Sequence, residues 1–299
     1  MSIAMIALAV VLLVSHYRPQ WSSWRRPERV WDGLLAIGQR LGIDQRDGIA
    51  SVLLLIVLPG SLMFWLQQVL AGRWLGLAEL GLGVAVLFLC WGPRDLDADV
   101  AAAVENRESQ NRRLALANLG LEHAEESAVP GRLFHVALNR WFGPLFWFAL
   151  LGAAGALLFR LTRLASDPPP RPGSPMAALR TLVDWPVAHL MALALAVVGN
   201  FDTVFAAWKR WHQADGRGWW SGSIDFLQPI AECSVVVERH EQLEQAREEA
   251  EEEGEPPPAD SEGPDPLGAA LHDAQALLWR TLISWLLVLA LLLLAGIAS

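Results

Sequence analysis

Residues 48–72 read GIASVLLLIVLPGSLMFWLQQVLAG, a run of 25 residues without a formal charge. A helix rises about 1.5 Å per residue, so this run can cross the hydrocarbon core of a bilayer, which is about 30 Å thick. The whole chain of 299 residues is 53% apolar and 18% charged, with a mean hydropathy of +0.30. Soluble domains carry about 25% charged residues. This composition favours a polytopic membrane protein over a soluble globular one.

Five further runs are apolar enough to enter a membrane: residues 1–17, 74–93, 141–159, 185–201 and 281–299. Tryptophans lie at or near the ends of these runs, as in the aromatic belts of membrane proteins; they are Trp65, Trp74, Trp91, Trp141, Trp185, Trp208 and Trp279. No stretch shows the sustained alternation of a β-strand. We therefore expect an all-α fold, a polytopic helical membrane protein with cytoplasmic amphipathic helices.

The distribution of Lys and Arg predicts the orientation of these spans. If six spans place both termini outside, the inside segments carry 18 positive charges and the outside segments carry 5. Cytoplasmic loops are enriched in Lys and Arg, so loops 18–47, 94–140 and 209–278 are predicted to be cytoplasmic. The first run lacks the features of a cleaved signal peptide and is interpreted as an anchor. A re-entrant segment at 185–201 would reverse the C-terminal orientation.

The chain divides into four predicted parts. Residues 1–208 form a membrane core that includes a cytoplasmic helical loop at 92–140, and 209–237 form a cytoplasmic or interfacial helical segment. Residues 238–266 are interpreted as a disordered linker, because 238–265 carry 12 acidic and two basic residues together with several prolines. Residues 267–299 continue as a helix into the last span. The net charge of −9 therefore comes from the linker.

Common signatures of catalysis and metal binding are missing from the sequence. Its single lysine, Lys209, follows no glycine-rich loop, and no GxSxG or HExxH motif is present. Cys90 and Cys233 lie far apart and form no zinc-ligand spacing with histidines. We predict no catalytic residue and no metal site, and the sequence indicates no particular cofactor. The chain lacks the basic patch typical of nucleic-acid binding.

Two carboxylates within apolar runs have alternative interpretations. Glu79 is an intramembrane carboxylate that either reaches interfacial water or binds an ion or proton. Asp184 precedes Pro186, which makes it a candidate helix cap, and with His189 it is also a candidate ligand contact.

Two segments resemble a known family. Residues 137–160 read ALNRWFGPLFWFALLGAAGALLFR, and residues 182–190 read LVDWPVAHL. With PRDL at 93–96 and apolar spans in matching order, they resemble AmpE, a bacterial inner-membrane protein associated with the regulation of inducible β-lactamase. The resemblance implies a multi-pass protein of the inner (cytoplasmic) membrane that senses or modulates cell-wall recycling. It also implies a family-motif core, formed by Pro144, Leu145, Phe146, Trp147 and Trp185.

AmpE is in turn similar to the CobD/CbiB membrane synthases of cobalamin biosynthesis. The polar motifs of those enzymes are largely lost here, for example at residues 135–140 and 163–166, so a regulatory protein without catalysis is favoured. Two alternatives stay open: a divergent enzyme of this type that acts on a phosphorylated ligand, and a transporter or channel that uses Glu79. The expected partners are the lipid bilayer and a cell-wall-derived ligand or a protein on the cytoplasmic face. The candidate ligand-binding residues are Asp184, His189, Asn139, Arg140 and Arg94.

Overall fold

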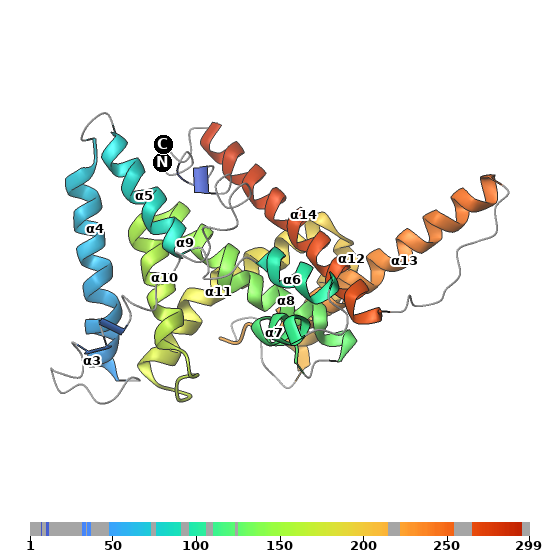
Figure 1. Ribbon diagram of the computed structural model, residues 1–299, viewed down its shortest axis with the longest axis horizontal. Helices are drawn as coiled ribbons and strands as arrows, with labels where there is room; N and C mark the ends of the chain where they lie inside the picture. The colour runs from blue at the N-terminus through green and yellow to red at the C-terminus, as the bar shows by residue number, and fades with distance from the viewer. Residues whose placement is uncertain are drawn as a thin grey trace. The chain divides into compact units, whose positions relative to one another are not determined.

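The structure is a computed structural model. It describes residues 7, 10–11, 32–33, 35–36, 48–72, 76–90, 96–105, 110–122, 125–214, 222–253 and 265–294. Across these ranges every regular element is helical, which confirms the all-α fold class (Figure 1). The chain forms two compact units. Unit 1 comprises Met1–Asp95, Leu138–Val187 and Leu289–Ser299, and unit 2 comprises Leu96–Ala137 and Ala188–Val288.

Among the described residues, three helical segments are long and apolar enough to cross a membrane: Ile49–Leu70, Pro175–Val198 and Pro266–Leu291. They contain 22, 24 and 26 residues, and a bilayer core needs about 20. The first coincides with the predicted span at 48–72. The other two begin earlier than the predicted runs at 185–201 and 281–299, because the apolar faces of these helices continue beyond the uncharged stretches. Most of the predicted run at 1–17 and most of the predicted cytoplasmic loop 18–47 lie outside the described residues.

The first of these segments contains a π-helical turn. It consists of α3 (Ile49–Val52), the π-helix η2 (Leu53–Val57) and α4 (Leu58–Leu70). Pro59 has no N–H to offer the carbonyl four residues earlier, and its ring would collide with that carbonyl in a regular helix. A wider turn just before the proline relieves this conflict. The π-helix η5 (Leu138–Phe142) precedes Pro144 in the same way.

The predicted run at 74–93 contains a shorter helix. Helix α5 extends over Leu77–Cys90, 14 residues, which is about 21 Å at the usual helical rise. Residues 73–75 and 91–95 lie outside the described part of the chain. Helix α5 by itself is therefore shorter than the hydrocarbon core.

The structure differs from the single span predicted at 141–159. Helix α9 (Gly143–Leu151) ends at Gly152, whose φ of +66° favours glycine, and α10 (Ala153–Ala165) begins there. A Cβ on Gly155 would lie 2.1 Å from the Trp147 carbonyl oxygen, and one on Gly143 would lie 2.0 Å from the Phe159 ring. In each pair one residue precedes the turn and the other follows it at a similar distance along the chain. Helices α9 and α10 therefore form an antiparallel hairpin (Figure 1). Glycines at 143, 152 and 155 permit this close return.

Helix α4 packs along α10 in unit 1. A Cβ on Gly60 would lie 2.3 Å from the Leu158 side chain, so the two helices touch at this glycine. A cluster of buried side chains continues the contact; its members are Leu55, Ile56, Leu161, Ala165 and Met176, the last from α11 (Pro175–Val198). Truncation of such buried side chains costs about 2–5 kcal/mol of stability.

Unit 2 contains α6 (Leu96–Glu105), α7 (Gln110–Asn118), the 3-10 helix η4 (Glu126–Ala128), α8 (Val129–Ala137), α12 (Phe201–Gln213), α13 (Leu227–Glu253) and most of α14 (Pro266–Leu294). Helix α8 packs closely on α13, because a Cβ on Gly131 would lie 2.3 Å from Cγ of Gln228. Asp97 in the first turn of α6 accepts hydrogen bonds from Gln275 at 2.6 Å and Trp279 at 3.0 Å on α14. These contacts hold α8 to α13 and α6 to α14.

Helix α13 extends into the segment predicted to be a disordered linker. Residues 238–253 are helical, whereas 254–264 lie outside the described part of the chain. Glu, Gln, Ala and Arg have high helix propensity, and no proline occurs in the segment before Pro256. Local propensity therefore outweighs the repulsion among the acidic side chains up to Glu253.

Candidate functional site

The two segments that carry the family resemblance meet in unit 1. The indole Nε1–H of Trp147 on α9 donates a hydrogen bond of 3.0 Å to the carbonyl oxygen of Val183 on α11. Pro144 and Leu145 are buried, and the Phe146 ring packs edge-on against Trp147 with centroids 5.2 Å apart. The segment PLFW thus fixes α9 against the residue that precedes Asp184.

Asp184 is buried between arginines. It is 2% exposed, and its Oδ2 lies 2.7 Å from Nη1 of Arg163 and 3.7 Å from Nε of Arg180. The predicted helix cap at Asp184 is wrong, because α11 begins at Pro175 and contains both Asp184 and Pro186. A buried carboxylate must be paired to remain charged, and here α10 and α11 supply the two cations. We call Arg163, Arg180 and Asp184 the ion cluster.

The other candidate ligand-binding residues lie on η5, on α11 and outside the described part of the chain. Asn139 and Arg140 belong to the π-helix η5 in unit 1, and His189 belongs to unit 2. Asn139 Oδ1 is buried and has no hydrogen-bond partner among the described residues. Arg94 lies outside the described part of the chain. The partners of Asp184 are instead Arg163 and Arg180, which sequence reasoning did not select, although the four-residue spacing of Arg180 and Asp184 was a usable signal.

An apolar groove of about 420 Å³ lies in unit 1 among α4, α9, α10 and α11. It is lined by Ile56, Val57, Gly60, Ser61, Phe64, Trp147, Leu151, Ala154, Leu158, Thr162, Leu179, Leu182 and Val183. Val183 and Trp147, which form the hydrogen bond described above, both contribute to its wall. Val183 on this wall immediately precedes Asp184 of the ion cluster in the sequence.

Glu79 lines a smaller cavity of about 30 Å³ in unit 1. Gln67 and Gly152 also line it, and the Oε1 of Gln67 lies 3.4 Å from the N–H of Ala154 at the start of α10. A cavity of this size can hold about one water molecule. Gln67, which was not among the predicted site residues, thus lines the same cavity as Glu79 and accepts a hydrogen bond at the tip of the hairpin.

Unit 2 contains a cluster of aromatic and histidine rings. The His189 ring lies 4.6 Å from the Phe226 ring and 5.7 Å from the Trp208 ring, and His212 lies 6.4 Å from His189, measured between centroids. His212 is buried, with Nδ1 2.9 Å from the Trp208 carbonyl oxygen. His189 thus packs in an aromatic environment.

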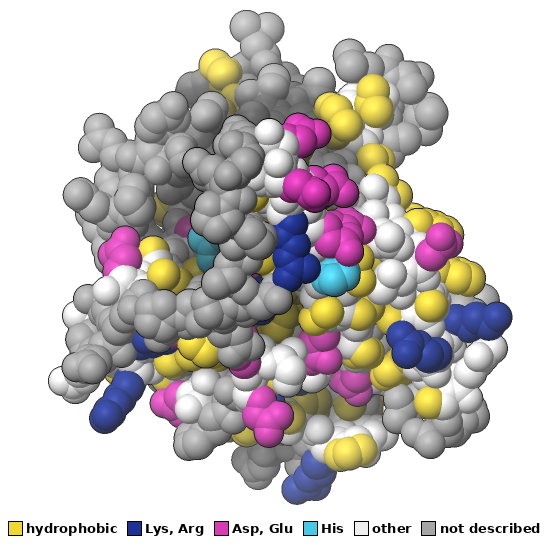
Figure 2. All heavy atoms as spheres, turned by 90° about the vertical axis from the view of Figure 1, so that its right-hand side faces the viewer, with side chains coloured by type: hydrophobic (Ala, Val, Ile, Leu, Met, Phe, Trp, Pro, Cys, Tyr) yellow, Lys and Arg dark blue, Asp and Glu magenta, His cyan; other side chains and the backbone are white. Residues whose placement is uncertain are grey.

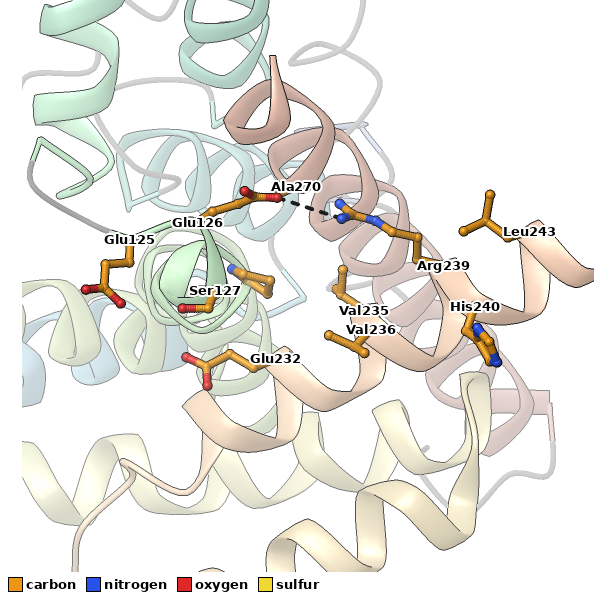
Figure 3. Close-up of a pocket in the computed structure, with 11 residues that line it drawn as sticks. Glu125, Glu126, Ser127, Glu232, Val235, Val236, Arg239, His240, Leu243 and Ala270 are labelled. Atoms are coloured by element: carbon orange, nitrogen blue, oxygen red, sulfur yellow. Dashed lines mark ion pairs between the residues drawn. The ribbon is translucent and has the colours of Figure 1, made fainter. Parts of the chain in front are cut away.

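A second groove of unit 2, of about 680 Å³, lies beside α13. Glu126 and Arg239 point toward each other across it, with a nearest N–O distance of 3.8 Å, and Glu125 and Glu232 line the same space (Figure 3). Arg239 also pairs with Asp273 at 2.9 Å. Acidic side chains gather beside apolar ones on one face of the molecule (Figure 2). This groove combines a paired arginine with several carboxylates.

Within the described residues, no group of three or more His, Cys, Asp or Glu side chains could hold a metal ion. Comparisons with protein-family models, with curated proteins and with solved structures find no match to this chain. Functional inference therefore rests on the residues and their geometry.

Proposed function

We propose that this chain is a multi-pass membrane protein of the AmpE type, located in the bacterial inner membrane, that senses or modulates a signal linked to cell-wall recycling and β-lactamase induction. The observation that supports this proposal most directly is the Trp147–Val183 hydrogen bond, because it joins the two segments on which the resemblance rests. Asp184 follows Val183 directly and connects α11 to α10 through Arg163. Both contacts fix the part of α11 that belongs to unit 1.

The ion cluster between α10 and α11 could respond to a ligand, as a sensor requires. Arg180 is the more exposed member of the ion cluster, with 35% of its side chain accessible and 3.7 Å to Asp184. An anionic ligand that binds Arg180 would compete with Asp184 for the guanidinium and alter the packing of α11 on α10. A ligand shifts a conformational equilibrium only by its differential affinity for the two states. The proposed signal is this change in the ion cluster.

The test replaces the chromosomal copy of the gene with variants and measures β-lactamase induction by a β-lactam. We expect W147F and D184N to alter induction as deletion of the gene does, while the protein remains in the membrane fraction. The matched control is D202N, because Asp202 is exposed in the first turn of α12. Induction that is unchanged by deletion of the gene would exclude the regulatory role.

A transporter or channel is the second candidate, supported by the cavity at Glu79. Ion sites in transporters are typically formed at the ends of discontinuous helices, and ionisable side chains within the membrane often mark ion or proton pathways. Glu79, Gln67 and the hairpin tip at Gly152 provide these components. Purified protein in liposomes would then move an ion or proton, and E79Q would abolish that flux. Absence of flux in the unmodified protein would rule out this candidate.

A further inference from the structure

The apolar groove of unit 1 has the form of a binding site for a hydrocarbon chain. Helices α4 and α10 run antiparallel along it, from Ile56 and Thr162 at one end to Phe64 and Ala154 at the other. Eight residues of helix separate the two ends, which corresponds to about 12 Å. At the middle of the groove, Gly60 lies directly against Leu158. The lining is almost entirely aliphatic or aromatic, so it favours an apolar occupant over water.

The groove opens through exposed apolar side chains. Val57 is 42% exposed, Phe64 47% and Leu182 68%, although all three line the same cavity. The neighbouring segments Ile49–Leu70 and Pro175–Val198 are long and apolar enough to cross a membrane. An opening of this kind on such helices gives access from the hydrocarbon region of a bilayer.

One end of the groove adjoins the ion cluster. Thr162 and Leu179 line this end, and the residues that follow them in sequence are Arg163 and Arg180. The cluster holds two guanidinium groups and one carboxylate, so its net charge is positive. Arg180 lies too far from Asp184 for a hydrogen bond, and its N–H groups donate to no acceptor among the described residues. A half-exposed arginine with available donors favours an anionic group, above all a phosphate.

We propose that this groove binds an anionic phospholipid, with one acyl chain along α4 and α10 and the phosphate at Arg180. The proposal rests on the membrane location given under Proposed function, but not on the regulatory role. Charge selects the lipid class: an anionic headgroup complements the positive cluster, whereas the quaternary ammonium of a choline lipid offsets its own phosphate. Burial of the acyl chain supplies the affinity, and Arg180 supplies the preference for a negatively charged headgroup.

The experiment measures lipid retention by the full-length protein. Protein purified in a mild detergent is delipidated and mixed with equal amounts of phosphatidylglycerol and phosphatidylcholine that carry the same acyl chains, and the bound lipid is counted by native mass spectrometry. We expect one phosphatidylglycerol to be retained in preference to phosphatidylcholine. R180Q should reduce that preference about tenfold, the effect of losing one charge-assisted hydrogen bond.

A second pair of variants tests the groove. Ser61 is exposed and lines the cavity, so S61F should fill the space and abolish retention of both lipids. Leu62 is its neighbour and is 64% exposed, but it does not line the groove, so L62F should retain phosphatidylglycerol normally. R171Q, which removes an exposed arginine of the loop before α11, should keep the preference and so controls for non-specific attraction.

Several outcomes overturn the proposal. They are equal retention of both lipids by the unmodified protein, an unchanged preference in R180Q, and normal retention in S61F. Inorganic phosphate that displaces the lipid at millimolar concentration would indicate a site for free phosphate instead. Release of the protein from membranes by alkaline carbonate would contradict the membrane location itself, and this result is distinguishable because it needs no lipid measurement. A thermal unfolding midpoint within a few degrees of the unmodified protein verifies that each variant is folded.

Discussion

Asp184 is a buried charge to which two helices supply cations. Arg163 comes from α10, 21 residues earlier in the sequence, and Arg180 lies one helical turn earlier on α11. Desolvation of an ion pair costs several kcal/mol per charge, and the mutual attraction offsets this cost only when both partners remain. At the residue scale, the Arg163–Asp184 pair therefore acts more as a specific link between α10 and α11 than as a source of net stability.

Removing one partner of this pair should be more damaging than removing both. We expect R163M to lower the free energy of unfolding by about 3–5 kcal/mol, because it leaves the Asp184 carboxylate buried with a more distant cation. The double variant R163M/D184L should recover most of that loss, since it removes both charges of the pair and leaves neither one buried without its partner. Reversible unfolding in mixed micelles measures all four states of the cycle. Additive losses in the double variant would show that the two side chains do not interact.

Cys233 permits a pH-dependent test outside the candidate spans. Burial raises the pKa of its thiol above the ordinary value, although the nearby Arg210 partly opposes this effect. The neutral thiol is thus favoured in the folded protein, and its contribution to stability is present below the ordinary thiol pKa of about 8.5 and is lost as the pH rises through the higher folded value.

In the C90A background, the alkylation rate of Cys233 should therefore be low at pH 7 and should still be rising above pH 9. The same thiol in detergent-unfolded protein provides the reference, and its rate should level off at a lower pH. Coincident profiles for the folded and unfolded protein would refute the shift. Mass spectrometry of the iodoacetamide adduct over time gives the rates.

At the element scale, two prolines and one glycine set the course of the apolar helices. The π-helical turns precede Pro59 and Pro144, and the chain reverses at Gly152. Proline effects are local and can be anticipated from sequence. The reversal was not anticipated, because an uncharged run such as 141–159 is equally compatible with one spanning helix or with a short hairpin. The positive φ of Gly152 and the packing of Gly155 against the backbone of α9 distinguish the two.

Two glycine-to-alanine variants should have opposite effects on stability. Gly155 faces the Trp147 carbonyl oxygen, 2.1 Å from the position of an added Cβ, so G155A should cost about 1–3 kcal/mol through overpacking. Gly81 lies within α5 with nothing within 4 Å, so G81A should stabilise by about 0.5–1 kcal/mol. Unfolding in mixed micelles compares the two variants. Equal effects would argue against the close hairpin.

At the scale of the whole molecule, exposed apolar side chains gather on the helices that are long enough to cross a membrane. On α14 they recur every four residues at Ile283, Leu287 and Leu291, which are 58%, 60% and 55% exposed. The earlier part of the same helix carries polar contacts, for example the pair of Asp273 with Arg239. Helix α14 therefore combines a first half that makes polar contacts beside its buried apolar side chains with a second half whose apolar side chains are exposed, as expected for a helix that continues into a bilayer.

A charge on the apolar half of α14 should impair membrane insertion. An arginine at the centre of a membrane helix costs about 2.5–3.5 kcal/mol, so L287R should reduce the share of protein that resists alkaline carbonate extraction. H272R is the matched control, because the His272 side chain is 78% exposed in the polar half. We expect H272R to behave like the unmodified protein. Equal extraction of both variants would argue against a spanning α14.

The sequence by itself determined the helical class and, among its six apolar runs, the three that the described helices bear out as long enough to cross a membrane; it also contains Pro59 and Pro144, which the π-helical turns precede. These features depend on composition, period and proline chemistry within about 25 residues of chain. The tertiary structure alone decided the hairpin at Gly152, the pairing of Asp184 with Arg163 and the groove along α4 and α10. The physical reason is that each of these features forms where segments distant in sequence come into contact. In the sequence, a glycine indicates only that a neighbouring segment needs space, and a carboxylate in an apolar run indicates only that a cation must lie near it. Which helix fills the space or supplies the cation is fixed when the helices pack.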